Sequence, residues 1–252
     1  MVPVSPEPDP EPPAAESFAP DPGAVRRGEL IRPAPVVFRD GDGDDEGDDG
    51  DGGTELGAVF RPYLRDYIGD SIGRSGPSNA ICPFVRGALR AGVMHYAELR
   101  VAGHTAPRAV ARALVGYLAW FDRASQRESP EHPGLVVAFP GPPAPLLPVV
   151  AAAHRAVLPA VYARGCTAAL FHEDPAEPDD PHHPEPRYFT APAPFYVLRR
   201  IIPADLQLSL RVRQMFPAYH RLHAAEARRT RLRTKEAAER WNQACREHGL
   251  TP

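Results

Sequence analysis

The residues best suited to chemistry lie at the end of one apolar run and in the polar loop behind it. His172 directly follows the apolar run 167–171, and the loop 172–190 contains several carboxylates together with His182 and His183. Imidazole and carboxylate side chains are ligands for zinc, iron and heme iron, and α/β proteins gather functional groups at strand ends. The spacing matches no named zinc motif. We therefore interpret His182 and His183 as polar loop residues and keep His172 as a candidate ligand, with a mononuclear metal enzyme as one hypothesis.

A cysteine next to a proline is the second candidate. Cys82 stands directly before Pro83, a residue that keeps the chain rigid and extended there. A thiolate can ligate a metal or act as a nucleophile, but a free cysteine is more often a small buried apolar residue, and both interpretations of Cys82 stay open. Cys166 and Cys245 fit structural positions. Three scattered cysteines form neither a disulfide framework nor a paired zinc motif, which indicates a reducing compartment.

The motifs of several large enzyme classes are missing from the sequence. We find no GxGxxG after an apolar run, no Walker loop, no HExxH and no CxxC. Dinucleotide-dependent and P-loop chemistries are therefore disfavoured.

Charge divides the chain into an acidic tail and a basic body. Residues 1–56 hold 15 acidic and 4 basic side chains, whereas residues 57–252 hold 17 acidic and 25 basic ones. The first 35 residues contain ten prolines, and the run 40–53 has no apolar residue. Such composition buries too little surface to offset the entropy of ordering. We predict a disordered Pro-rich and acidic tail over 1–54, in which the apolar patch 35–38 could dock on the body.

Hydropathy indicates a soluble, cytoplasmic protein. No uninterrupted run reaches the roughly 18 apolar residues of a membrane span, and the N-terminus lacks the basic start and apolar stretch of a secretory signal.

The periodicity of the body predicts strands that alternate with helices. We expect helices over 55–70, 106–126, 146–164 and from 205 to about 246, and strands over 93–101, 135–139, 167–171 and 195–202. Strands alternating with crossover-length helices are typical of an α/β fold, or α+β sandwich, with a central sheet of at least four strands. The sequence thus predicts a single α/β domain over 55–220.

The segment 221–252 is rich in arginine. Between 221 and 247 it holds eight basic and four acidic residues, which fits a solvated helix with pairs such as Glu236–Arg240. Nucleic acid is an improbable partner, since no aromatic interleaving or known binding module accompanies the charge. A non-enzymatic hypothesis follows, in which this helix binds a partner and the acidic tail is an autoinhibitory competitor.

Four short motifs in order resemble a known family. These are Cys82-Pro83-Phe84, a predicted strand ending in Phe139-Pro140, Phe171-His172, and a block over 187–205 that contains Pro192-x-Pro194, an apolar run, Arg199 and Asp205. Together they resemble an actinobacterial family of unknown function, over about 80–208. That family is more distantly similar to the YqcI/YcgG proteins, which include heme-dependent N-hydroxylases of guanidino or amino groups.

The resemblance implies a heme-dependent oxidative enzyme of the N-oxygenating type, acting in specialised metabolism on an amine or guanidine-like small molecule. His172 or Cys82 would be the axial ligand of the heme, because imidazole and thiolate are both ligands of heme iron. Arg187 and Arg199 would bind the heme propionates or an anionic substrate. Asp205 would support such a ligand or cap the last helix, and we favour the cap. Homo-oligomers are compatible with the sequence.

Overall fold

The computed structural model describes residues 35–38, 54–68, 83–127, 133–172 and 191–251, and these form a five-stranded mixed sheet flanked by helices. The strand order is β1-β2-β3-β5-β4. This confirms the α/β class and the expected sheet of at least four strands.

Two crossover helices connect the central strands of the sheet. The strands are β2 (Met94–Glu98), β3 (Gly134–Ala138), β4 (Cys166–Phe171) and β5 (Phe195–Arg200). Helix α4 (Pro107–Arg127) connects β2 to the parallel strand β3, and α5 (Pro143–Ala163) connects β3 to β4. Because β3 and β4 both pair antiparallel with β5, they run in the same direction. Strand β5 lies between them, so β4 is an edge strand.

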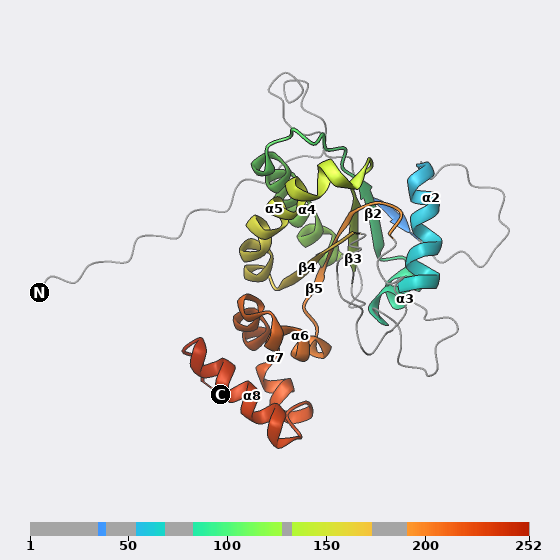
Figure 1. Ribbon diagram of the computed structural model, residues 1–252. Coiled ribbons are helices and arrows are strands. Elements are labelled where there is room, and N and C mark those ends of the chain that lie inside the picture. Colours follow the sequence, from blue (N-terminus) through green and yellow to red (C-terminus); the bar gives the residue numbers. More distant parts are fainter. Residues whose placement is uncertain (1–34, 39–53, 69–82, 128–132, 173–190, 252) are drawn as a thin grey trace, which may run out of the picture.

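Helices cover both faces of the sheet, as Figure 1 shows. Helices α4 and α5 lie on one face, where they bury an apolar core that includes Leu118, Val137 and Tyr196. The other face is covered by α2 (Glu55–Pro62), its continuation Tyr63–Ile68, which is a π-helix, and α3 (Pro83–Arg90). The sequence predicted one helix over 55–70. The winding changes directly after Pro62, a residue that cannot donate the ordinary helical hydrogen bond.

Two elements were not predicted. Val36–Phe38 forms the edge strand β1, antiparallel to β2, so this apolar patch of the tail docks on the body as a strand. The other tail residues, 1–34 and 39–53, lie outside the described ranges. Helix α3 follows Cys82, in a region whose sequence gave no helical period long enough to be recognised.

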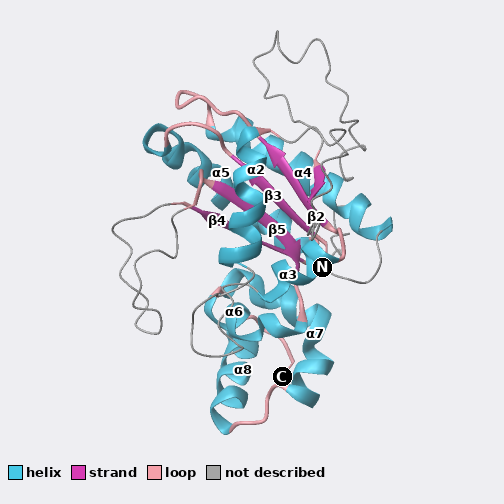
Figure 2. Ribbon diagram, turned by 90° about the vertical axis from the view of Figure 1, so that its right-hand side faces the viewer, coloured by secondary structure: helices cyan, strands magenta, loops and turns pink. Residues whose placement is uncertain are grey.

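The C-terminal segment contains three helices where the sequence predicted one long helix, with Pro217 as the place of any break. They are α6 (Leu206–Arg211), α7 (Phe216–Thr230) and α8 (Lys235–Glu247), which lie together beyond one end of the sheet (Figure 2). Val212 leaves the helical conformation (φ −93°, ψ 84°), and Pro217 lies in the first turn of α7, where proline is tolerated. The buried rings of Trp241 and Phe216 hold α7 against α8. Segment 221–252 therefore comprises most of α7 and all of α8.

One described helix, α5, is long and apolar enough to cross a membrane by length and composition alone. Its residues Val150, Ala153 and Val161 are fully buried in the core. Through these residues α5 packs in the core of the domain.

Candidate functional site

The face of the sheet opposite α4 and α5 carries a regular grid of side chains. The strand register aligns them in three rows, namely Met94–Gly134–Arg199–Thr167, Tyr96–Val136–Val197–Ala169 and Glu98–Ala138–Phe195–Phe171. Alternate residues of a strand point to the same face, so each row crosses β2, β3, β5 and β4. The rows end at the edge strand β4.

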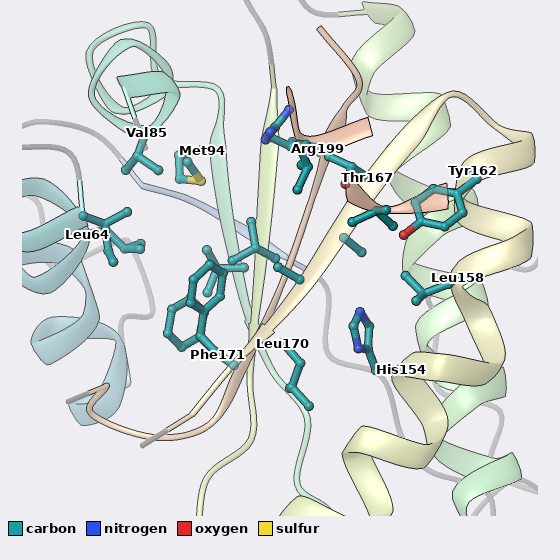
Figure 3. A pocket seen from close by; sticks show the side chains of 18 residues that line it. Leu64, Val85, Met94, His154, Leu158, Tyr162, Thr167, Leu170, Phe171 and Arg199 are labelled. Carbon is teal, nitrogen blue, oxygen red and sulfur yellow. The ribbon is translucent and has the colours of Figure 1, made fainter. Parts of the chain in front are cut away.

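A pocket of about 620 Å³ opens where this grid meets β4 (Figure 3). Its described lining is mostly apolar and comprises Leu64, Ile68, Val85, Met94, Val136, His154, Leu158, Tyr162, Thr167, Ala168, Ala169, Leu170, Phe171, Phe195, Val197, Arg199, Leu208 and Val212. Figure 3 shows that the lining lies on both sides of β4, with Leu64 and Phe171 on one side and His154, Leu158 and Tyr162 on the other. The size and apolar character are those of a small-molecule site.

Arg199 is the charged side chain of the described pocket wall, and it forms an ion pair with Asp205. Its two terminal nitrogens donate to the two carboxylate oxygens of Asp205, at 2.6 Å each, and its guanidinium lies 5.7 Å from the ring centre of Phe84. Asp205 also accepts a hydrogen bond from the backbone N–H of Ile202 at 2.9 Å. The carboxylate makes no cap of α6. Asp205 thus stands at the expected N-cap position of α6, but its carboxylate binds Arg199 and the turn before α6 in place of a capping hydrogen bond to that helix.

His154 is the histidine of the pocket wall. Its ring projects from α5 towards β4 and packs edge-on against the ring of Tyr196, with centres 5.8 Å apart. Its Nε2 is buried and has no hydrogen-bond partner. Burial lowers the pKa of this imidazole, while the backbone of Ala168 has a smaller opposing effect. At neutral pH the ring is therefore neutral.

The candidates from the sequence are not brought together in the described part of the chain. Cys82 and Arg187 lie outside the described residues. His172 lies at the end of β4, half-buried, with a buried Nδ1 that has no hydrogen-bond partner, but it is not among the described residues that line the pocket. Arg199 alone of the four lines the pocket. Within the described ranges there is no cluster of three or more His, Cys, Asp or Glu residues that could hold a metal ion.

Sequence reasoning missed His154. The signal was present, because His154 is the one histidine in a helix that is otherwise rich in alanine, valine, leucine and proline. A polar ring in such a stretch needs a partner or a function. The loop histidines gave the stronger local signal, because they stand close to carboxylates in the sequence.

The end of the sheet next to Arg200 is a structural network. Arg200 forms an ion pair with Asp122 at 3.0 Å and donates to Ser125 at 2.7 Å and to the sulfur of Cys166 at 3.4 Å. Burial nevertheless raises the pKa of the Cys166 thiol to about 11. Cys166 is therefore protonated at neutral pH and offers no thiolate to a ligand or substrate.

The opposite end of the sheet holds a buried acid. Glu98, which is 8% exposed, accepts hydrogen bonds from the hydroxyls of Tyr96, at 3.0 Å, and Thr54. Thr54 also caps α2, since its hydroxyl oxygen accepts the N–H of Gly57 at 3.1 Å. This cluster fixes the start of α2 on the sheet, and the π-helical continuation of α2 places Leu64 and Ile68 in the pocket wall.

Sequence comparison gives a family and no further relatives. Residues 58–235, more than half of the chain, match the family described as Domain of unknown function (DUF6875). No curated protein and no solved structure matches the chain.

Proposed function

The chain belongs to the DUF6875 family, and we propose that it is a heme-binding oxidative enzyme that holds its cofactor in the pocket around β4. The cofactor and the reaction type come from the resemblance to YqcI/YcgG proteins. The proposal extends to an N-oxygenating reaction on an amine or guanidine-like substrate, in specialised metabolism and in the cytoplasm.

The observation that carries this proposal is the pocket itself. It measures about 620 Å³, and most of the described residues that line it are apolar. Small-molecule sites are concave and apolar with few polar groups, and their volumes fall between roughly 300 and 1,000 Å³. A mainly apolar small molecule or cofactor is the class of ligand that such a lining favours.

The resemblance implies His172 or Cys82 as the heme ligand. His154, the histidine among the described lining residues, has its Nε2 buried among protein atoms. Arg199 supplies a positive charge of the type that binds a propionate, and it would do so by sharing its guanidinium with Asp205. Heme, when bound, would supply the activation of oxygen, and the apolar lining would exclude water from it.

The test is a spectrum of the purified protein. The chain is produced in cells fed a heme precursor, and the ferric and ferrous–CO absorption spectra are recorded, with hemin titrated into the apoprotein in parallel. A Soret band at a stoichiometry near one heme per chain supports the proposal. A chain that takes up hemin in neither experiment overturns it.

A second candidate function has its own observation, the basic turn between α7 and α8. Arg228, Arg229, Arg231, Arg233 and Lys235 are all exposed, and no acidic residue lies between them. Of these, Arg229, Arg231 and Arg233 form no side-chain ion pair within the described part of the chain. Such a surface favours an acidic protein partner that is attracted over distance. The expected competitor, the acidic tail, lies outside the described residues.

A further inference from the structure

Among the described strands, β4 has a partner on one side only. It pairs with β5 and forms one outer edge of the sheet, as Figure 2 shows. At the start of β4, the N–H of Ile201 donates to the carbonyl of Gly165 at 3.0 Å. Hydrogen-bonded and non-hydrogen-bonded pairs alternate along an antiparallel ladder. The main-chain N–H and C=O groups of Ala168 and Leu170 therefore point away from β5.

The sequence of β4 lacks the features that protect the free edges of sheets. Natural edge strands carry charged residues, prolines or bulges, whereas Cys166–Phe171 contains no charge and no proline and pairs with β5 without interruption. The imidazole of His154 forms a hydrogen bond with the backbone of Ala168. No described residue bonds the outward N–H and C=O of Leu170. These two groups are a template for another strand.

The pocket follows both sides of this edge. Leu64 and Phe171 line it on one side of β4, and Leu158 and Tyr162 line it on the other (Figure 3). An extended chain directs alternate side chains to opposite faces, so a strand added to β4 would place side chains in both halves of the pocket. An apolar molecule without amide groups would instead cover the outward polar groups of Leu170 and leave them without partners, which costs free energy.

The charge around the edge favours an acidic occupant. Arg155 lies three residues before Leu158 on α5, and Arg211 lies three residues after Leu208 on α6. Each arginine is thus on the same side of its helix as a leucine of the pocket wall. Both arginines are exposed, and neither forms an ion pair within the described ranges. Since α5, β4, β5 and α6 contain no acidic residue, a second copy of this edge would bring like charges together, whereas an acidic segment would meet opposite ones.

We infer that the free edge of β4 is a docking site for an extended, acidic segment of another protein, which adds to the sheet as a further strand. In this mode of recognition, main-chain hydrogen bonds give affinity and pockets for alternate side chains give specificity. Apolar side chains of the segment would enter the two halves of the pocket, and its acidic side chains would lie near Arg155 and Arg211. The inference goes beyond the proposed cofactor and does not rest on it, because no contact that carries it involves heme.

The probe is a fluorescent peptide of sequence Glu-Val-Leu-Val-Leu-Glu with blocked ends, titrated against the full chain without hemin and followed by fluorescence anisotropy. The control peptide has the same sequence with N-methyl groups on its central amides, so it keeps the charges and side chains and loses the main-chain donors. The wild-type chain should bind the control at least ~10-fold more weakly, as expected when main-chain hydrogen bonds are lost. Equal affinity for the two peptides would overturn strand addition, and the pocket would then accept any apolar anion.

Leu170→Pro tests the edge of β4 itself. The substitution removes an N–H that points away from β5, and proline is tolerated at such positions of an edge strand. Leu170→Ala keeps the N–H and is the matched control for loss of the side chain. Leu170→Pro should bind the unmodified peptide about 10-fold more weakly than Leu170→Ala, because one main-chain donor is missing. Equal affinities of the two variants would overturn the inference.

The charge argument has its own pair of variants. The double change Arg155→Gln with Arg211→Gln should weaken peptide binding roughly 5-fold at low salt, since exposed charges attract an acidic ligand modestly. The double change Arg108→Gln with Arg112→Gln removes two exposed charges from α4 and should change binding little. Equal losses in the two double variants would overturn the assigned acidic preference. Far-UV circular dichroism and urea unfolding establish that each variant is folded.

Sedimentation velocity tests the competing occupant, a second copy of the chain. The wild type should sediment as a monomer at the concentrations of the titration, and a dimer that Leu170→Pro dissociates would overturn the inference. None of these measurements includes hemin. A failure of the proposed heme function would therefore appear only in the hemin titration, and a failure of strand addition only here.

Discussion

Arg199 and Asp205 are joined by two parallel hydrogen bonds of 2.6 Å, across the turn that leads from β5 to α6. Their side chains are only 14% and 8% exposed, so the pair is largely withdrawn from water. Asp205 also holds the N–H of Ile202. The guanidinium thereby fixes the path of the chain from the sheet into the C-terminal helices, and Leu208 of α6 reaches the pocket wall as a result.

Asp205→Asn should strongly lower the free energy of unfolding. The change leaves the buried guanidinium of Arg199 without its counter-charge, and breaking a buried pair in this way costs about 3–5 kcal/mol. The measurement is urea unfolding followed by circular dichroism. The double variant Arg199→Met with Asp205→Leu removes both charges and should recover most of the loss. A single variant within about 0.5 kcal/mol of wild type would show that the pair contributes little.

Thr54→Val should destabilise the start of α2. The hydroxyl both caps the helix through Gly57 and donates to Glu98, and loss of an N-cap costs about 0.5–2 kcal/mol. Thr54→Ser keeps the hydroxyl and is the matched control. Unfolding free energies from urea titration decide the outcome, and equal values for the Val and Ser variants would contradict the assigned role.

The sequence predicted the strands and crossover helices because their patterns are local. The secondary structure can be predicted from the apolar pattern alone in the runs 135–139 and 167–171 and in the periodic segment 106–126. The structure places β3, β4 and α4 within a few residues of these segments. Strand β1 has only three residues. It forms by pairing with β2. Three residues are too few to show the alternating pattern from which a strand is predicted.

The candidate site was harder to predict, because it depends on strand order. The insertion of β5 between β3 and β4 makes β4 an edge strand, and this opens the pocket beside it. His154 and Arg199 are 45 positions apart in the sequence and line one pocket, from opposite sides of β4, only through that arrangement. The loop around His182 gave a stronger local signal but lies outside the described residues. Spacing identifies residues able to do chemistry, whereas topology selects those that share a cavity.

Ala169→Phe should block ligand binding at the pocket. Ala169 lies on β4 among the lining residues, so a phenyl ring at this position would occupy part of the space that the ligand needs. We expect hemin affinity to fall at least ~10-fold, with a stability loss no larger than the roughly 1–3 kcal/mol of an overpacked core, because the ring enters open volume. Ala102→Phe, at an exposed position of the body, is the control. Unchanged hemin titration of Ala169→Phe would place the ligand elsewhere.

The free energy of unfolding should decrease at alkaline pH because of the buried thiol of Cys166. The fold raises the pKa of this thiol from 9.0 to about 11, so the folded chain keeps its proton where the unfolded chain has lost it. The stabilising contribution is complete below pH 9 and is lost as the pH rises through 11, by up to about 1.4 kcal/mol per pH unit. Urea unfolding at pH 7.5, 9 and 10 should show a smaller decline for Cys166→Ala than for wild type. Parallel declines in the two proteins would contradict the shifted pKa.

The basic turn should bind an acidic peptide in a salt-dependent manner. A synthetic peptide with the sequence of residues 39–53 carries eight acidic side chains and serves as the probe, titrated against the full chain by fluorescence anisotropy. The triple change of Arg229, Arg231 and Arg233 to Gln should weaken peptide binding at least ~10-fold. Raising the ionic strength from 0.05 to about 0.5 M should also weaken peptide binding to the wild type, because salt screens exposed charges. A control triple change to Gln at the exposed residues Arg90, Arg108 and Arg112 of the body removes the same charge from another surface. Equal losses in the two triple variants would mean that net charge attracts the peptide, and the turn would then have no specific role as a docking surface.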